Sequence, residues 1–394
     1  MKILYHHRIA SKDGQYVHVE DLVKALRGIG HEVVMVGPRV AEEEEFGSEG
    51  GWVAKLRAAL PQAVYELLEF GYSLIAYFKL RRAVIEHKPD CLYERYNLFM
   101  PAGVWISRRF NLPMLSEVNA PLFEERRRFG GLRLRKLARW SEVFVWRNAN
   151  RVLPVTEVLA GHVRQVGVSD DRIEVSHNGI DLQRFGGTCD KVSAKQKLGL
   201  ANKAVLGFTG FVRDWHGLDV VVDMLAEPGL GDAALLLIGD GPARADLEAQ
   251  ARRLGVDDRF KVTGVVGRDQ LAAYLGAFDI ALQPAAVAYA SPLKLFEYMA
   301  IDAAIIAPRQ DNILEILTDA HDAVLFDTES RADFREKLYS LFSDPALRER
   351  LALQARQTLL KQGYTWEANA KRVEALFTGL RGRHDATTAA AGYN

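Results

Sequence analysis

The chain has 394 residues, more than one ordinary hydrophobic core organises, so we expect two domains. Lysine plus arginine number 51, as do aspartate plus glutamate, which argues against a nucleic-acid partner. Apolar residues make up 48%, ample for two packed α/β units. In the first half, a helix is predicted at 18–29, and short apolar strands are predicted at 2–5, 31–37, 91–93, 114–118 and 151–155.

A second set of strands follows at 204–208, 234–238, 260–263, 280–283 and 304–307, separated by helices such as 243–254 and 269–276. Strands that alternate with helices favour parallel sheets covered on both faces. Two such sets predict two Rossmann-like domains, with a boundary in the polar stretch 181–194. The expected ligand site is a cleft between them, at the carboxyl ends of their strands.

The cellular location of the protein is predicted from the absence of signal-peptide, transmembrane and disulfide patterns in the sequence. The start, Met1-Lys-Ile-Leu-Tyr5, has no long apolar region or small-residue cleavage site of a signal peptide. No apolar run reaches the roughly 18 residues of a transmembrane helix. Cys91 and Cys189 match neither a metal spacing nor a disulfide framework. We therefore expect a cytoplasmic protein. Its small, polar end at 385–394 is predicted to be a disordered tail.

The segment 291–300, Ser-Pro-Leu-Lys-Leu-Phe-Glu-Tyr-Met-Ala, is the most informative stretch. Pro292 suits the first turn of a helix, and Ser291 before it suits the cap. The start of a helix presents unpaired N–H groups that bind a diphosphate. Lys294 and Glu297 share one helix face, which places an ammonium for phosphate beside a carboxylate for hydroxyl groups. The alternative is an amphipathic helix with an ordinary ion pair.

Four more segments precede this one in the order 175–181, 207–217, 235–242 and 260–267. The first carries the turn signal Asn178-Gly179, and each of the other three is a strand that leads into a glycine turn. The second also holds Arg213 and His216 ahead of a predicted helix. Taken singly, each is an ordinary α/β connection.

The order and spacing of these segments resemble glycosyltransferase family 4, whose members have the two-domain GT-B fold. The likeness is strongest over 236–284, and the N-terminal half matches through 14–20, 30–33 and 117–121. The resemblance implies an N-terminal Rossmann-like acceptor domain at 1–182 and a nucleotide-sugar domain at 183–364. It also implies a helix at 365–384 that crosses back to the N-terminal domain.

Several positions depart from the family pattern. Tyr289 stands where the family usually carries a glutamate that contacts the transferred sugar. His216 replaces a lysine in the phosphate turn, and Phe211 stands at the place of the usual arginine, which is displaced to Arg213 or lost. Asn119 replaces a histidine of the N-terminal domain. These changes leave sugar specificity and the details of mechanism open.

The resemblance implies a retaining hexosyltransferase that uses a nucleotide-diphosphate sugar, with UDP favoured over GDP, and a glycan or lipid-linked acceptor in surface or exopolysaccharide assembly. Arg213, Lys294 and His216 are the candidate cations for the leaving diphosphate. The sequence has no Asp-x-Asp pair, so we expect no metal and no cofactor besides the donor. The predicted catalytic residues are Asn119, Arg213 and Lys294, and the predicted donor-binding residues are Gly14, Arg213, His216, Gly264, Ser291, Leu293, Lys294 and Glu297.

Two alternatives remain open. A sugar-nucleotide 2-epimerase also uses two Rossmann-like domains, but it needs acid–base carboxylates around the sugar. A catalytically silent subunit that only binds nucleotide sugar is motivated by Tyr289 and His216. Turnover of the donor with and without an acceptor separates the three hypotheses.

The stretch 124–140 is unusually basic, since many arginines oppose only Glu124 and Glu125. With the Leu-, Tyr- and Phe-rich stretch 52–85, it predicts a face that rests on anionic lipid at the inner side of a membrane. An equally weighted interpretation is a solvated helix face, or salt bridges to the acidic residues 42–45.

Overall fold

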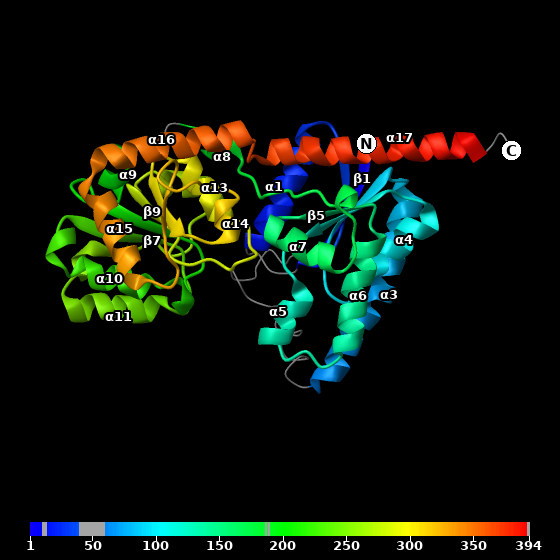
Figure 1. Ribbon diagram of the computed structural model, residues 1–394, viewed down its shortest axis with the longest axis horizontal. Coiled ribbons are helices and arrows are strands. Elements are labelled where there is room, and N and C mark those ends of the chain that lie inside the picture. The colour runs from blue at the N-terminus through cyan, green and yellow to red at the C-terminus, as the bar shows by residue number, and fades with distance from the viewer. Residues whose placement is uncertain (10–13, 39–59, 186, 188–189, 392–394) are drawn as a thin grey trace. The chain divides into compact units, whose positions relative to one another are not determined.

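Figure 1 shows the computed structural model, which describes residues 1–9, 14–38, 60–185, 187 and 190–391. The acidic stretch 42–45, residues 52–59 and Cys189 lie outside the described residues. The chain forms two compact units, unit 1 (Met1–His177, Tyr289–Ser291 and Trp366–Asn394) and unit 2 (Asn178–Ala288 and Pro292–Thr365).

The chain first passes from unit 1 to unit 2 between His177 and Asn178, slightly before the predicted boundary stretch. Ile180, just before that stretch, forms a bridge with Thr365, and Phe185 within it is buried in the unit 2 core, so the stretch already belongs to unit 2.

Unit 1 contains a five-stranded parallel sheet in the order β2-β1-β3-β4-β5. Strands β3 and β4 are buried along their whole length, as expected for a parallel sheet covered on both faces. Chain order reverses between β1 and β3, where ligands bind in open α/β sheets. The elements are β1 (Lys2–His6), α1 (Gly14–Gly28), β2 (Glu32–Val36), α3 (Gln62–His87), β3 (Cys91–Arg95), α4 (Ala102–Phe110), β4 (Met114–Val118), α5 (Leu122–Phe129), α6 (Arg135–Asn148), β5 (Arg151–Pro154), α7 (Glu157–Gln165) and α17 (Trp366–Ala391).

The C-terminal helix α17 belongs to unit 1 and packs along α1. Its buried residues Trp366, Ala370, Val373 and Phe377 recur at three- and four-residue spacing and so form one stripe. The ring of Trp366 lies 4.7 Å from that of His18 on α1. The helix is described through Ala391, and it therefore continues into the range predicted as a disordered tail.

A buried carboxylate joins α3 to the start of α6. Glu66 accepts hydrogen bonds from the backbone N–H groups of Arg133 (2.9 Å) and Leu134 (2.6 Å), immediately before α6 begins. Negative charge at a helix N-terminus is favourable, and these N–H groups have no acceptor within the helix. Glu66 thereby fixes the basic segment around 133–136 against α3.

Unit 2 contains a six-stranded parallel sheet in the order β11-β10-β9-β6-β7-β8, and its chain order reverses between β6 and β9. Both units are thus Rossmann-like α/β folds. The elements are α8 (Leu182–Phe185), α9 (Lys191–Lys197), β6 (Ala204–Thr209), α10 (Leu218–Leu225), β7 (Ala233–Ile238), α11 (Arg244–Leu254), β8 (Phe260–Val262), α12 (Arg268–Leu275), β9 (Ile280–Leu282), α13 (Leu293–Ala300), β10 (Ala304–Pro308), α14 (Asp311–Leu314), β11 (Val324–Phe326), α15 (Arg331–Ser343) and α16 (Pro345–Gln362).

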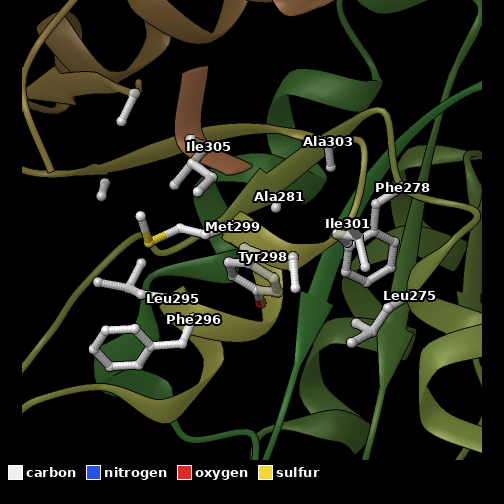
Figure 2. Close-up of a cluster of buried hydrophobic side chains, with 14 of the residues drawn as sticks. Leu275, Phe278, Ala281, Leu295, Phe296, Tyr298, Met299, Ile301, Ala303 and Ile305 are labelled. Carbon is white, nitrogen blue, oxygen red and sulfur yellow. The ribbon is translucent and has the colours of Figure 1, made fainter. Parts of the chain in front are cut away.

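Helix α13 is anchored by the apolar core of unit 2. Leu295, Phe296, Tyr298 and Met299 are buried among side chains from β9, β10 and α12 (Figure 2). The rest of its first turn, including Lys294, lies at the edge of this core. Among the residues that the structure describes, no helix is both long and apolar enough to cross a bilayer.

Candidate active site

In unit 2, two glycine turns extend the pairing of β6 and β7 beyond the strands. The N–H of Gly210 donates to Ile238 O at 2.9 Å, and that of Val212 donates to Asp240 O at 2.9 Å. A Cβ on Gly239 would lie 2.1 Å from Gly210 O, and its φ of +135° also requires glycine. Close backbone contact therefore shapes this edge of the sheet.

The third glycine turn reaches the same edge. Gly264, which follows β8 with φ of +70°, forms an isolated bridge with Gly239. The turns after β6, β7 and β8 are thus consecutive along the carboxyl edge of the sheet.

Lys294 lies against the first of these turns. Its Nζ is 3.9 Å from the centroid of the Phe208 ring and would be 3.3 Å from a Cβ placed on Gly210. Burial lowers the pKa of Lys294 to about 7, although the charge of Glu297 opposes the shift. An ammonium that has lost hydration without gaining a full counter-charge is suited to receive an anion.

Tyr298, in the second half of α13, ties this helix to the strand ends that flank the reversal point. The Tyr298 hydroxyl accepts a hydrogen bond from Thr209 N–H at 3.1 Å and donates to Leu282 O at 3.3 Å. The N-cap is Pro292, one residue after Ser291, which the sequence predicted as the cap. Leu293 and Lys294 are therefore the first helical residues, and N–H groups at these positions have no intrahelical acceptor.

His216 lies beside Lys294 but carries no charge at neutral pH. Its Nδ1 accepts the backbone N–H of Arg213 at 3.0 Å, and its ring meets Phe208 edge-on. Burial, followed by the charges of Lys294 and Arg213, lowers the pKa of His216 to about 3. The expectation that His216 supplies positive charge is therefore corrected.

The Arg213 guanidinium is exposed and lies over the Phe211 ring at 5.1 Å.

In unit 1, buried ionisable side chains gather at the carboxyl ends of β1, β3 and β4. His6 Nδ1 and Glu94 Oε2 lie 2.6 Å apart at the end of neighbouring strands. A Cβ on Gly103 would lie 2.1 Å from Glu94 Oε2, so only glycine leaves room for this carboxylate. The pair adds to the hydrogen bonds of β1 and β3 at the reversal point of the sheet.

Glu117 is the centre of a second, larger cluster. Its carboxylate accepts hydrogen bonds from Tyr93 (2.5 Å) and Arg95 (2.7 Å), and it lies 3.0 Å from His18 Nε2. Asn119 Nδ2 donates to the same carboxylate. Burial by itself raises the pKa of Glu117, but the charges of His18 and Arg95 and the hydrogen bonds of His18 and Tyr93 hold it well below its ordinary value.

The family resemblance includes Glu117 in the segment 117–121 and singles out Asn119, but the sequence does not predict the cluster around Glu117. A charged residue inside an otherwise apolar strand, Glu117 in 114–118, is the sequence feature that points to this cluster. The residues that bond to Glu117 cannot be read from the sequence, because most of them lie far away along the chain. His7 and His177 each hydrogen-bond to the backbone: His7 Nδ1 accepts Ile9 N–H, and His177 Nδ1 donates to Val155 O.

Tyr289 belongs to the short segment that groups with unit 1. Its carbonyl accepts a hydrogen bond from Thr156 Oγ1 at 2.9 Å. Burial, then the charge of Glu125 and a hydrogen bond to it, raise the pKa of the Tyr289 hydroxyl. The residue that replaces the family's glutamate is thus a neutral, hydrogen-bonded side chain.

The predicted site residues divide between the units. Unit 2 brings together Arg213, His216, Gly264, Leu293, Lys294 and Glu297 around the carboxyl edge of its sheet. Gly14, Asn119 and Ser291 belong to unit 1, where Gly14 is the first residue of α1 and residues 10–13 before it lie outside the described part.

Two Rossmann-like α/β units, each with candidate residues at the edge where its chain order reverses, define the GT-B fold class. Solved structures share this fold. Sucrose-phosphate synthase from Thermosynechococcus elongatus matches 97% of this chain and 100% of its own with a TM-score of 0.76 and 17% identity. Anabaena HepE in complex with UDP matches 96% and 100% with a TM-score of 0.75 and 16% identity.

Two family models match the sequence, Glycosyltransferase Family 4 over residues 12–184 and Glycosyl transferases group 1 over residues 190–358. The chain belongs to the family 4 glycosyltransferases. It is 25% identical to D-inositol 3-phosphate glycosyltransferase of Streptomyces bingchenggensis over 59% of this chain, a match that spans about half (54%) of that relative's length. The D-inositol 3-phosphate glycosyltransferase of an Arthrobacter species is 24% identical over 91% of this chain and 88% of its own.

Proposed function

We propose that the protein transfers a hexose from a nucleotide-diphosphate sugar, UDP-linked rather than GDP-linked, to a glycan or lipid-linked acceptor. The observation that carries this proposal is Lys294, which belongs to the first turn of α13 and lies against a glycine turn. A half-buried ammonium beside helix N–H groups is a diphosphate-binding arrangement. The fold neighbour HepE, whose structure contains UDP, supports the choice of nucleotide.

Transfer breaks the bond between the anomeric carbon and the diphosphate oxygen, so negative charge grows on the leaving phosphate. Lys294 and the N–H groups of Leu293 and Lys294 stabilise that charge, and exposed Arg213 adds a second cation. Glu297, one turn further along the helix, holds the ribose hydroxyls. For retention of configuration, the leaving phosphate takes the proton of the acceptor hydroxyl on the face from which it departs.

The reaction is proposed to need no divalent metal, because the sequence has no Asp-x-Asp pair to chelate one against the diphosphate. Turnover that persists in EDTA supports this proposal, and turnover that requires Mg²⁺ or Mn²⁺ contradicts it.

We place the reaction in surface or exopolysaccharide assembly, with Asn119 in unit 1 on the acceptor side. We also propose that the basic stretch 124–140 of unit 1 contacts an anionic membrane.

The test is turnover by the full chain with UDP- and GDP-hexoses, with and without a glycolipid extract. Release of UDP that depends on the acceptor, together with a labelled product, is the expected result. A changed sugar nucleotide without any acceptor favours the epimerase, and nucleotide binding without turnover favours the silent subunit. Lys294→Ala tests the role of Lys294 in this turnover. Its control is Lys197→Ala, which removes an exposed lysine of unit 2.

A further inference from the structure

Helix α3 carries an apolar face that points into solvent. Between residues 62 and 78, every exposed residue of this helix is apolar or glycine. The large ones are each between 42% and 65% exposed, and together with exposed Gly71 they recur every three or four residues along one side: Val64, Leu67, Leu68, Leu74, Ile75 and Phe78. A monomeric soluble protein rarely leaves such a continuous apolar strip exposed, so the strip marks a binding surface.

The fold itself uses the opposite side of α3. Its buried residues include Glu66, Ser73, Ala76 and Leu80, which face the rest of unit 1. Ser73 Oγ donates to Phe99 O at 2.6 Å, and Glu66 holds the segment before α6. Because α3 is already docked by this side, the residues of the exposed apolar strip lie outside the buried core formed by the described residues of unit 1.

Cations border the apolar strip at both ends. At its C-terminal end, the exposed residues of the next turn are Lys79, Arg81 and Arg82. Near its N-terminal end, Glu66 holds the backbone of Arg133, which is followed by exposed Arg135 and Lys136. In Figure 1, α3 and α6 run alongside each other within unit 1.

An exposed aromatic side chain extends the strip onto α6. The ring of Trp140 is 45% exposed and lies 6.0 Å from that of Phe70 on α3. Tryptophan is enriched at the boundary between lipid headgroups and acyl chains, where one part of its ring is apolar and another is wet.

We propose that this face of α3 inserts lengthwise into the surface of an anionic lipid bilayer, with the bordering cations on lipid phosphates. The inference rests on the proposed membrane contact and identifies the element that makes it. Residues 64–78 span about 22 Å at a rise of about 1.5 Å per residue. This is shorter than a hydrocarbon core of about 30 Å, so the helix lies in the interface rather than across it.

The cations at both ends of the strip favour a lipid surface as its binding partner over a second copy of the chain. An antiparallel pairing of two α3 helices would set Lys79, Arg81 and Arg82 of one copy near Arg133 of the other, and a parallel pairing would set them against themselves. The acid exposed nearby, Glu86, already lies 3.6 Å from Arg82. Like charges disfavour both pairings, whereas anionic headgroups complement both ends of the strip.

The experiment is sedimentation of the full chain with vesicles of phosphatidylcholine alone or with phosphatidylglycerol added. Wild type is expected to bind the anionic vesicles. The double variant Leu74→Gln/Phe78→Gln should lose roughly tenfold or more of that binding, because lipid no longer covers two large apolar groups. Arg81→Gln/Arg82→Gln should remove much of the preference for anionic lipid. The matched control Leu353→Gln/Leu360→Gln, which changes exposed leucines of α16, should bind like wild type.

The outcomes separate this inference from the proposals on which it rests. Equal binding by Leu74→Gln/Phe78→Gln and wild type, with unchanged thermal unfolding, overturns the role of α3 but leaves a membrane contact elsewhere. No vesicle binding by wild type overturns both. A wild-type dimer that the same variant dissociates, without vesicle binding, identifies a second copy as the occupant and also overturns the proposal. Failure of UDP-hexose turnover refutes the transferase function without affecting the vesicle result.

Discussion

The carboxyl edges of the two parallel sheets differ in composition: backbone turns form the edge in unit 2, and paired side chains form the edge in unit 1. In unit 2, the edge at the β6/β9 reversal consists of backbone turns at Gly210, Gly239 and Gly264, with one ammonium, Lys294, against them. In unit 1, the corresponding edge at β1/β3 and the next strand is filled by paired side chains centred on Glu94 and Glu117. In the first, the turns pair backbone with backbone beside a single lysine, whereas in the second, carboxylates lie against histidine, tyrosine and arginine side chains.

Under the proposed function, this difference corresponds to a division of labour. A glycine turn beside a helix start is complementary to any diphosphate, so unit 2 suits the common part of a sugar nucleotide. A buried cluster of carboxylates, histidine and arginine fixes the orientation of the few side chains at its margin, such as Asn119. Such a margin suits the variable partner of the reaction, the acceptor.

The largest expected effect is on the stability of unit 1. Glu117→Gln keeps the shape but leaves Arg95 and His18 without their buried counter-charge, so it should lower the free energy of unfolding by about 3–5 kcal/mol. Chemical denaturation of variant and wild type measures this. The control Glu367→Gln, in an exposed pair with Lys371, should change it by less than about 1 kcal/mol. An unchanged stability of Glu117→Gln would mean that the cluster does not brace unit 1.

The difference in stability between wild type and Glu117→Gln should also depend on pH. The pKa of Glu117 is lowered in the folded state, so its stabilising contribution is complete above the ordinary value of about 4.5 and declines as pH falls below it. The difference between wild type and Glu117→Gln should therefore be constant near neutral pH and shrink in acid. A difference that grows in acid contradicts this assignment.

The next effect concerns catalysis in unit 2. Lys294→Ala should lower the rate of transfer by roughly 10²–10³-fold, more than it weakens donor binding, because phosphate charge grows in the transition state. Arg213→Ala should act in the same direction but less, since its guanidinium is exposed. Steady-state kinetics measure the rate constant and the Michaelis constant separately. If both variants raise only the Michaelis constant, the two residues bind the donor without assisting its departure.

A smaller effect is expected on ground-state binding. Glu297→Ala should weaken UDP binding by about 1.5–3 kcal/mol, the usual contribution of a hydrogen bond to a charged group. Calorimetric titration with UDP measures the dissociation constant, and 2′,3′-dideoxyuridine 5′-diphosphate, which lacks the ribose hydroxyls, provides the control. Wild-type affinity in the variant would remove Glu297 from the nucleotide site.

The smallest effect is the pH dependence of nucleotide binding. The pKa of Lys294 is about 7 in the empty protein, and a bound diphosphate should raise it toward the ordinary lysine range. Binding then takes up a proton above pH 7, and affinity should fall by up to about tenfold per pH unit as pH rises. Calorimetry in buffers of different ionisation enthalpy measures this uptake. Lys294→Met should abolish it, and uptake that persists in the variant assigns the proton to another group.

Local chemistry was sufficient to predict much of unit 2. Apolar runs gave the strands because buried parallel strands need apolar side chains on both faces, and the glycine turns after them were visible because backbone contact excludes a Cβ. Lys294 and Glu297 were found because a helix period places them on one face. In each case, the residues that interact lie close in sequence or belong to consecutive elements.

The Glu117 cluster and the outer face of α3 were decided by tertiary structure. His18, Tyr93 and Glu117 come from three elements, and no spacing in the sequence shows that β3, β4 and α1 bring them within hydrogen-bonding distance. Helix α3 is rich in apolar residues on several sides, so its periodicity does not reveal which strip is buried. That choice depends on which side meets unit 1, because only contact with the folded sheet and its helices distinguishes a core residue such as Leu80 from an exposed one such as Phe78.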